Sequence, residues 1–282
     1  MTWGRFGYIC RKASVDHRDN ESIAHCLQRI DREEASDLYG GREAADRWPR
    51  VILDKIGLMT DREEARRVLD IYRNLNLSQG FDEPMTLKRA VAYLGLVLFV
   101  FYSVVGLYHL KIIPNFLKVF DTLGLSAPRS LILYQDYMGY FVLLVSVFLI
   151  TILLVGFEMR SLFKFTVGRE KGFIFKYLLF SPIRDSYRKV IAVLQFPVAD
   201  SGSNVTGSEE SVVRHLRAVR HSEMNVSVEM KALIEQEMKC LLDGCEKQVK
   251  LMLMLVGVVV LFGIFFFLTS AYSPIFILGD AV

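Results

Sequence analysis

Three long apolar stretches alternate with polar segments along the chain. They cover residues 90–110, 137–157 and 251–271, and none of them contains Asp, Glu, Lys or Arg. A helix of about 21 residues is roughly 30 Å long, which matches the hydrocarbon thickness of a bilayer. We therefore predict an all-α membrane protein with three transmembrane helices and two helical segments on one side of the membrane.

The first polar segment, residues 1–89, carries apolar residues at the spacing of helices. Thr60, Asp61, Arg62 and Glu63 form a capping-box pattern that opens one such helix. The apolar face of this helix is predicted to comprise Ala65, Val68, Leu69, Tyr72 and Leu75. An earlier helix is predicted from the spacing of Ile23, Leu27, Ile30 and Leu38. We expect residues 1–89 to form an N-terminal helical domain.

The second polar segment, residues 158–250, is predicted to form another helical domain. A polar break at 199–204 divides it into two helical blocks. After the break, the apolar residues Val212, Val213, Leu216 and Val219 share one helix face, opposite Arg214, Arg217 and Arg220. The helical period then continues from residue 227 into the third span, which predicts one helix of roughly 65 Å with Gly244 as the place for a bend.

The segments on the other side of the membrane are short. Residues 111–136 form a loop in which Pro114 suits the first turn of an amphipathic helix and Gly124 suits its C-terminal cap. Phe116, Phe120 and Leu123 share a face of that helix. Pro128 is predicted to start a second short helix, and residues 272–282 form a short tail after the third span.

The distribution of basic residues predicts the orientation. Residues 1–89 hold 16 Lys and Arg and residues 158–250 hold 15, whereas residues 111–136 hold three and residues 272–282 hold none. Because basic residues near a span are retained in the cytoplasm, we expect a cytoplasmic N-terminus and a C-terminus on the outer side.

Composition excludes some functions. The chain is 52% hydrophobic and 23% charged with a net charge of +3, which is too small a charge for a dedicated nucleic-acid binder. The four cysteines lie in the predicted cytoplasmic segments, so we expect free thiols. Cys10, His17, His25 and Cys26 could be read as zinc ligands, but they show neither a CxxC pair nor zinc-finger spacing, and no metal is expected.

The sequence also lacks the usual signs of catalysis. It contains no GxxxxGK[ST], HExxH or GxSxG motif, and the spans contain no charged residue for a proton relay or a selective pore. We therefore expect neither an enzyme nor a cofactor. Small residues in the spans favour close helix packing and homo-oligomerisation, or else are ordinary positions of apolar helices, since no GxxxG motif occurs in the spans. They comprise Ser103, Ser146, Thr151, Gly95, Gly106, Gly139, Gly257 and Gly263.

Several short motifs, at consistent places relative to the spans, resemble the type II secretion F family, which includes the inner-membrane platform proteins of type IV pili. After the first span come Pro114, Phe116, Gly124 and Pro128, although Ala127 stands where the family has Leu. Phe180-Ser181-Pro182 resembles the opening of the family's second cytoplasmic domain, and Pro274, Ile275 and Phe276 resemble its C-terminal end. The family's Gly-Glu-x-x-Gly turn is missing and both cytoplasmic segments are shortened, which implies a divergent member.

The resemblance implies a non-enzymatic platform of the bacterial inner membrane, with a periplasmic C-terminus. Its partners would be a cytoplasmic assembly ATPase, pilin or pseudopilin subunits, other inner-membrane assembly proteins and further copies of the chain. A basic surface in residues 158–250 is the candidate docking site for the ATPase or a scaffold, or else serves only to retain this segment in the cytoplasm. This surface comprises Arg184, Arg188, Lys189, Arg214, Arg217 and Arg220. A channel or transporter subunit and a membrane-anchored regulatory adaptor are the alternative functions.

Overall fold

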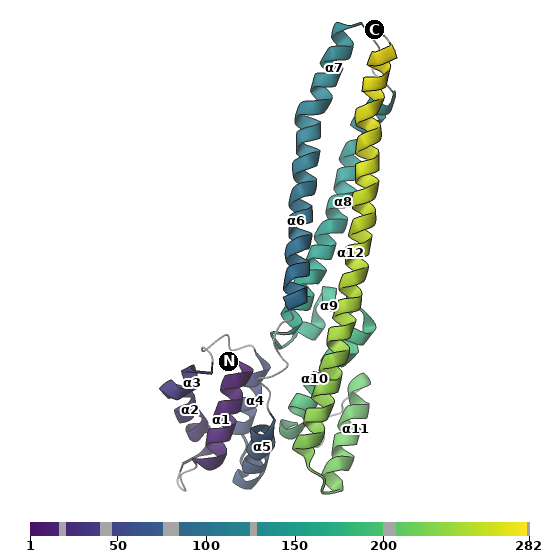
Figure 1. Ribbon diagram of the computed structural model, residues 1–282. Helices are drawn as coiled ribbons and strands as arrows, with labels where there is room; N and C mark the ends of the chain where they lie inside the picture. The colour runs from purple at the N-terminus through teal and green to yellow at the C-terminus, as the bar shows by residue number, and fades with distance from the viewer. Residues whose placement is uncertain (17–20, 40–46, 76–84, 125–128, 200–206, 281–282) are drawn as a thin grey trace. The chain divides into compact units, whose positions relative to one another are not determined.

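The chain is helical throughout most of the part that the computed structural model describes, namely residues 1–16, 21–39, 47–75, 85–124, 129–199 and 207–280 (Figure 1). These residues form no strand, and an isolated β-bridge pairs Arg47 with Thr166. The all-α prediction is confirmed. The elements are α1 Trp3–Val15, α2 Ile23–Arg32, α3 Glu34–Asp37, α4 Trp48–Gly57, α5 Arg62–Asn74, α6 Met85–Leu107, η1 Tyr108–Ile112, α7 Ile113–Thr122, α8 Arg129–Leu162, η2 Arg169–Lys171, α9 Phe173–Tyr177, α10 Ser181–Gln195, η3 Phe196–Val198, α11 Ser208–His221 and α12 Val226–Asp280.

The helices form two compact units. Unit 1 combines Met1–Glu83 with Glu158–Glu246, and unit 2 combines Pro84–Phe157 with Lys247–Val282. The sequence places 1–89 and 158–250 in separate domains, but the structure joins them in unit 1. The physical reason is that each set of short amphipathic helices has apolar faces that the other set covers.

Direct contacts join the two chain segments of unit 1. The hydroxyl of Tyr72 in α5 donates a hydrogen bond of 2.6 Å to the carbonyl oxygen of Leu194 in α10. The rings of Trp3 and Phe165 meet edge to face with centroids 6.0 Å apart. The backbone nitrogen of Trp48 donates to the carbonyl oxygen of Phe165 at 3.0 Å. These contacts bury polar and aromatic groups from both segments in one core.

The predicted helix faces of the first segment are largely confirmed. Ala65, Val68, Leu69, Tyr72 and Leu75 are all buried, as are Ile23, Leu27 and Ile30. The assignment of Leu38 to this core is wrong, because Leu38 follows the end of α3 and is 86% exposed. Helix α5 is capped by Asp61 instead of Thr60, since the Asp61 carboxylate accepts from the backbone nitrogen of Glu63 at 2.9 Å.

A buried arginine connects α1 to the C-terminal ends of α2 and α3. The side chain of Arg5 is fully buried and donates to the carboxylates of Asp31 at 2.8 Å and Asp37 at 2.5 Å. Arg5 also donates to the backbone carbonyl oxygen of Asp31. The side-chain carboxylate of Asp31 forms a further ion pair of 3.2 Å with Arg50. The guanidinium of Arg5 is therefore surrounded by acceptors, which offsets the cost of removing its charge from water.

Three helices are long and apolar enough to cross a membrane. They span Leu87–Thr122, Asp136–Leu162 and Val226–Thr269. Large apolar side chains along them, such as Phe99, Leu261 and Phe265, point outward and would be unfavourable in water. Since lipid is the environment that accepts such a surface, the chain is a multi-pass membrane protein.

Within unit 2, helices α6 and α8 approach closely at one glycine. A Cβ placed on Gly156 of α8 would lie 3.0 Å from Cγ2 of Val91 in α6, so the glycine permits close approach. The small residues that the sequence predicts to allow close helix packing have different surroundings. Ser103, Ser146 and Thr151 donate to carbonyl oxygens of their own helices. In the described part of the chain, no atom outside the adjoining helix backbone and the two chain neighbours lies within 4 Å of a Cβ built on Gly95, Gly106, Gly139, Gly257 or Gly263.

The short outer helices that the sequence predicts are continuations of the spans. Helix α7, with Pro114 in its first turn, follows α6 through the π-helical segment η1 without a loop. Gly124 adopts φ +65° just after α7, as a C-terminal glycine cap does. Helix α8 begins at Arg129, next to Pro128, which lies outside the described residues. Tyr108, Ile113 and Met138 form an apolar cluster at this end of unit 2.

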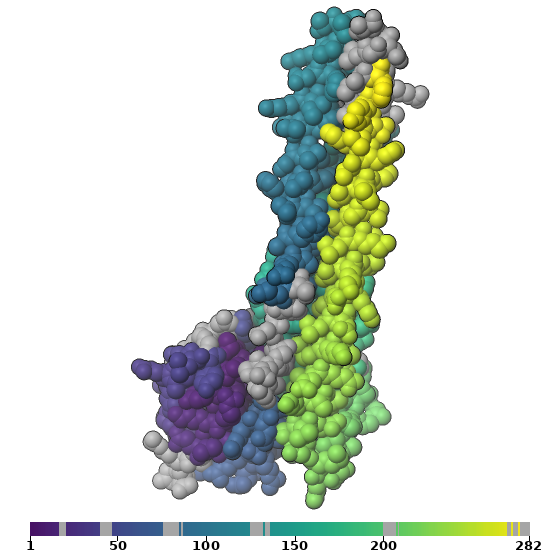
Figure 2. Space-filling view, viewed as in Figure 1, coloured from purple at the N-terminus to yellow at the C-terminus, as the bar shows by residue number. Residues whose placement is uncertain are grey.

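Helix α12 is a single helix of 55 residues, and its ribbon can be followed from green to yellow in Figure 1. Figure 2 shows the surface of its described residues in the same colours. Helix α12 confirms the predicted long helix and extends it to Asp280, through residues predicted to be a tail. Gly244 is predicted as a bend, but its observed role is contact: a Cβ there would lie 2.9 Å from Cγ1 of Ile183 in α10. The glycine lets two helices of unit 1 approach closely.

Replacing Arg5 with Ala is expected to lower the free energy of unfolding by about 3 kcal/mol, because Asp31 and Asp37 lose their buried partner. Thermal unfolding of the detergent-solubilised protein, followed by circular dichroism, measures the change. The control is Arg66→Ala, which removes an exposed pair with Glu63 and should cost at most about 1 kcal/mol. Equal melting temperatures for both variants would contradict the prediction.

Replacing Gly244 with Ala is expected to destabilise unit 1 by about 1 to 3 kcal/mol, because the new methyl group collides with Ile183. The matched control is Gly257→Ala in the same helix, where the space is open and alanine favours helix by up to about 1 kcal/mol. Melting temperatures should therefore move in opposite directions, and a common direction would disprove the packing role of Gly244.

Candidate docking surface

The six basic residues predicted as a docking surface lie on two neighbouring helices of unit 1. Helix α10 buries Ile183, Tyr187 and Val190, and α11 packs against it. The predicted apolar stripe of α11 is confirmed, since all four of its residues are buried: Val212, Val213, Leu216 and Val219. Packing of this stripe directs the opposite face of α11 to the surface.

The three basic residues on α10 are engaged within the protein. Arg184 donates to the carbonyl oxygen of Lys176, and the guanidinium of Arg188 lies 5.8 Å from the ring centroid of Phe175. Lys189 forms an ion pair of 3.1 Å with Glu237 of α12, whose side chain is only 11% exposed. These contacts join α10 to α9 and α12, so Arg184, Arg188 and Lys189 serve the fold.

The three arginines on α11 are exposed and form what we call the α11 arginine face. Arg214 pairs with Glu210 one turn earlier at 2.5 Å, whereas Arg217 and Arg220 form no hydrogen bond or ion pair with the described residues. His221 extends the basic surface at the end of the helix. The positive charge of Arg220 in the last turn suits the negative C-terminal end of the helix dipole. The guanidinium groups of Arg217 and Arg220 are available to a partner.

Two carboxyl groups lie beside α10 in an environment that favours their protonated form. Burial raises the pKa of Glu170 and of Glu209, while the charge of Arg188 opposes both shifts. Burial also raises the pKa of Tyr187, whose buried hydroxyl has no hydrogen-bond partner among the described residues. Because a raised carboxyl pKa means that the native state binds protons more tightly, the fold loses stability as pH rises from 4.5 through the raised values.

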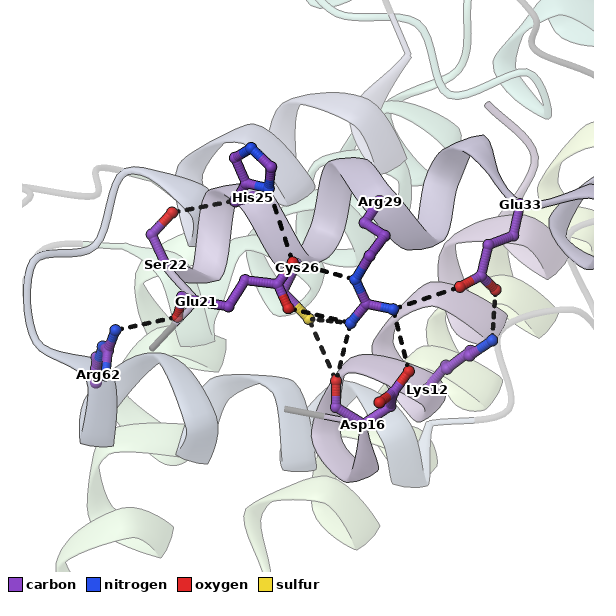
Figure 3. Close-up of polar contacts among 9 residues, drawn as sticks. All are labelled: Lys12, Asp16, Glu21, Ser22, His25, Cys26, Arg29, Glu33 and Arg62. Carbon is purple, nitrogen blue, oxygen red and sulfur yellow. Dashed lines mark hydrogen bonds and ion pairs between the residues drawn. The ribbon is translucent and has the colours of Figure 1, made fainter. Parts of the chain in front are cut away.

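A second polar cluster surrounds Arg29 of α2 (Figure 3). Its guanidinium pairs with Glu21 at 3.1 Å, Asp16 at 3.2 Å and Glu33 at 3.5 Å. Lys12 of α1 pairs with the same Glu33, and Arg62 of α5 donates to the carbonyl oxygen of Glu21 at 3.0 Å. The cluster thus connects α1, α2 and α5 and stabilises their packing in unit 1.

The cysteines of this region are poorly suited to nucleophilic chemistry. All four cysteines of the chain are free, and burial raises the pKa of Cys10 and of Cys26. Their thiols therefore stay protonated near neutral pH, whereas a thiolate is the reactive form. His17 lies outside the described residues, and the described ones include no group of three or more His, Cys, Asp or Glu placed to hold a metal ion.

The residues that carry the family resemblance occupy structural positions. Pro182 lies in the first turn of α10, after the extended Phe180, where a missing N–H costs no helix hydrogen bond. Pro114 lies in the first turn of α7, directly after the π-helical segment η1. Phe116 packs on the cluster of Tyr108, Ile113 and Met138. The backbone of Pro274 and Ile275 lies within α12, and Phe276 is exposed.

No protein-family model matches this chain, and no match was found among curated proteins or among solved structures. The assignment of a role therefore depends on the geometry. Sequence reasoning missed the buried Arg5 and the Arg29 cluster, because most of their partners lie 8 to 32 residues away along the chain. The spacing of the acidic residues along α2 and α3 gives no sign of which one a given arginine selects.

Reversing the charge of Lys189 by Lys189→Glu is expected to destabilise the protein by about 1 to 2 kcal/mol, because it places two carboxylates together in a largely buried pair. Glu237→Lys should have a similar cost. The double exchange restores an opposite-charge pair and should recover most of the melting temperature, as measured by thermal unfolding in detergent. If the melting temperature of the double variant fell by the sum of the two single decreases, the ion pair would not connect α10 to α12.

Proposed function

We propose that this protein is a non-enzymatic platform in a bacterial inner membrane, which couples a cytoplasmic assembly ATPase to the extraction of pilin or pseudopilin subunits. Helix α12 is the observation that carries the proposal. Its 55 residues contribute both to the membrane-spanning unit 2 and to the polar unit 1. A continuous helix provides a covalent and hydrogen-bonded connection from a membrane anchor to a surface outside the membrane.

The construction of unit 1 supports this role. Two chain segments separated by two spans fold into one body, which is held by the Tyr72–Leu194 hydrogen bond and the aromatic contact between Trp3 and Phe165. A force applied to such a body reaches α6, α8 and α12 through three chain connections. Residues 1–89 and 158–250 contain many more Lys and Arg than residues 111–136 and 272–282 do, which favours a cytoplasmic position for unit 1 and a periplasmic C-terminus.

The α11 arginine face is the proposed docking surface for the ATPase or a cytoplasmic scaffold. Arg214, Arg217 and Arg220 are presented on one helix, and two of them have no partner among the described residues. A carboxylate-rich surface is the chemical complement of such a row, because guanidinium groups bind carboxylates through paired hydrogen bonds. The basic residues of α10 are left out of this surface, since their contacts lie within unit 1.

Reversal of the arginine face, by Arg214→Glu, Arg217→Glu and Arg220→Glu together, is expected to reduce co-purification of the ATPase by at least about tenfold and to abolish filament assembly. Affinity purification in mild detergent, followed by mass spectrometry, measures the loss. The matched control reverses three exposed arginines of α5: Arg66, Arg67 and Arg73. This control should retain binding.

Both triple variants should keep the melting temperature of the parent protein within a few degrees, because the replaced side chains are exposed. Full filament assembly by the α11 variant would overturn the docking role. Absence of any secretion-type ATPase among the proteins that co-purify with the parent would overturn the platform function itself.

A further inference from the structure

The segment that follows α8 is firmly attached to the core of unit 1. Phe165 adopts φ 48°, a left-handed conformation that costs energy for a residue with a side chain, and its ring is fully buried. That ring stacks on Tyr187 with centroids 5.6 Å apart, and Phe175 meets the same tyrosine edge to face at 5.6 Å. The buried aromatic residues thereby fix the position of α9.

The other side of this segment exposes a group of apolar residues. Phe173 is 71% exposed and Tyr177 is 63% exposed, and their ring centroids lie 4.9 Å apart. The ammonium group of Lys176 lies 5.2 Å from the centroid of the Tyr177 ring. These two rings and the other exposed apolar side chains of the same chain segment are what we call the aromatic patch: Val167, Phe173, Tyr177, Leu178 and Phe180. Adjoining exposed aromatic residues of this kind mark a binding surface.

The charge around the aromatic patch is positive. Residues 158–185 contain six Lys and Arg and three acids, Glu158, Glu170 and Asp185. Lys164, Lys171 and Lys176 are exposed, whereas Glu170 is partly buried. Aromatic rings flanked by lysines are typical of surfaces that enter the headgroup region of an anionic bilayer, where the rings are partly buried and the ammonium groups meet phosphate.

This segment also follows the end of the long apolar run of α8. Glu158 is the first charged residue after the uncharged run 137–157 of α8. Arg169 pairs with Glu158 at 3.2 Å, and a Cβ built on Gly172 would lie 4.0 Å from its Oε1 atom. Gly172 directly precedes Phe173. The start of α9 therefore lies beside the first charged residue after the uncharged run of α8, where we expect this helix to leave the hydrocarbon.

From these observations the geometry points to the aromatic patch as an interfacial membrane contact, which binds the anionic headgroups of the same bilayer that α8 crosses. The patch and its lysines would lie on the membrane surface, with Phe173 and Tyr177 inserted among the headgroups. This contact goes beyond the platform function and does not depend on it, because it requires only the protein and lipid.

Fluorescence of a polarity-sensitive label tests the contact in the full-length protein. Cys240, the exposed thiol, is replaced with Ser, and a single labelled cysteine is introduced by Phe173→Cys or, as the control, by Leu58→Cys. Leu58 is 82% exposed and lies at the end of α4, also in unit 1. Each protein is reconstituted in vesicles that contain phosphatidylglycerol and lipids with a quencher at the headgroup.

The label at position 173 is expected to be quenched at least about twofold more than the label at position 58 and to emit at shorter wavelength. Lys171→Glu with Lys176→Glu, or vesicles of phosphatidylcholine alone, should reduce this difference. Melting temperatures equal to that of the parent confirm that the labelled proteins are folded.

Equal quenching at positions 173 and 58 would overturn the proposal. Shielding of position 173 that requires added soluble proteins would overturn it as well, because a protein would then be the occupant. The experiment contains no ATPase, so its failure leaves the platform function untouched and failure of the platform function leaves the membrane contact untouched.

Discussion

The fold depends on the requirement that every backbone N–H and C=O group in hydrocarbon finds its partner inside the protein. A helix meets this requirement by itself, so the three apolar runs must be helical over their full length. The helices extend beyond these runs: α6, η1 and α7 are continuous from Met85 to Thr122, and α12 runs from Val226 to Asp280. Even the serine and threonine hydroxyls of the spans follow this rule, because Ser103, Ser146 and Thr151 donate to carbonyl oxygens of their own helices.

A different constraint applies to unit 1, because its helices are mostly short and amphipathic and are expected to lie outside the hydrocarbon. A helix of 10 to 15 residues has too small an apolar face to be stable in water alone, so it needs neighbours. The chain supplies them from both sides of the first two spans, and Tyr72 and Phe165 mark where the segments meet. Ion pairs then fix the positions of these helices relative to one another, because Arg5 and Arg29 each pair with several carboxylates.

The basic residues of 158–250 show how one sequence feature can serve separate purposes. Arg184, Arg188 and Lys189 satisfy groups within unit 1, and the α11 arginine face remains open to a partner. The lysines around the aromatic patch form a third group near the end of α8. A count of charges along the chain gives the same weight to all of them, because charge by itself carries no information about which acceptors the fold brings near.

The sequence by itself determined the three spans, the helical class, the buried faces of α5 and α11 and the continuity of α12. These follow from local periodicity and length, and both are physical properties of a single helix. Only the tertiary structure decided that residues 1–83 and 158–246 share one core, that Gly244 permits close packing on Ile183, and that Leu38 lies at the surface. Those features depend on which helix faces meet, and helix faces far apart in the sequence can pair in many ways that hydrophobic spacing alone does not distinguish.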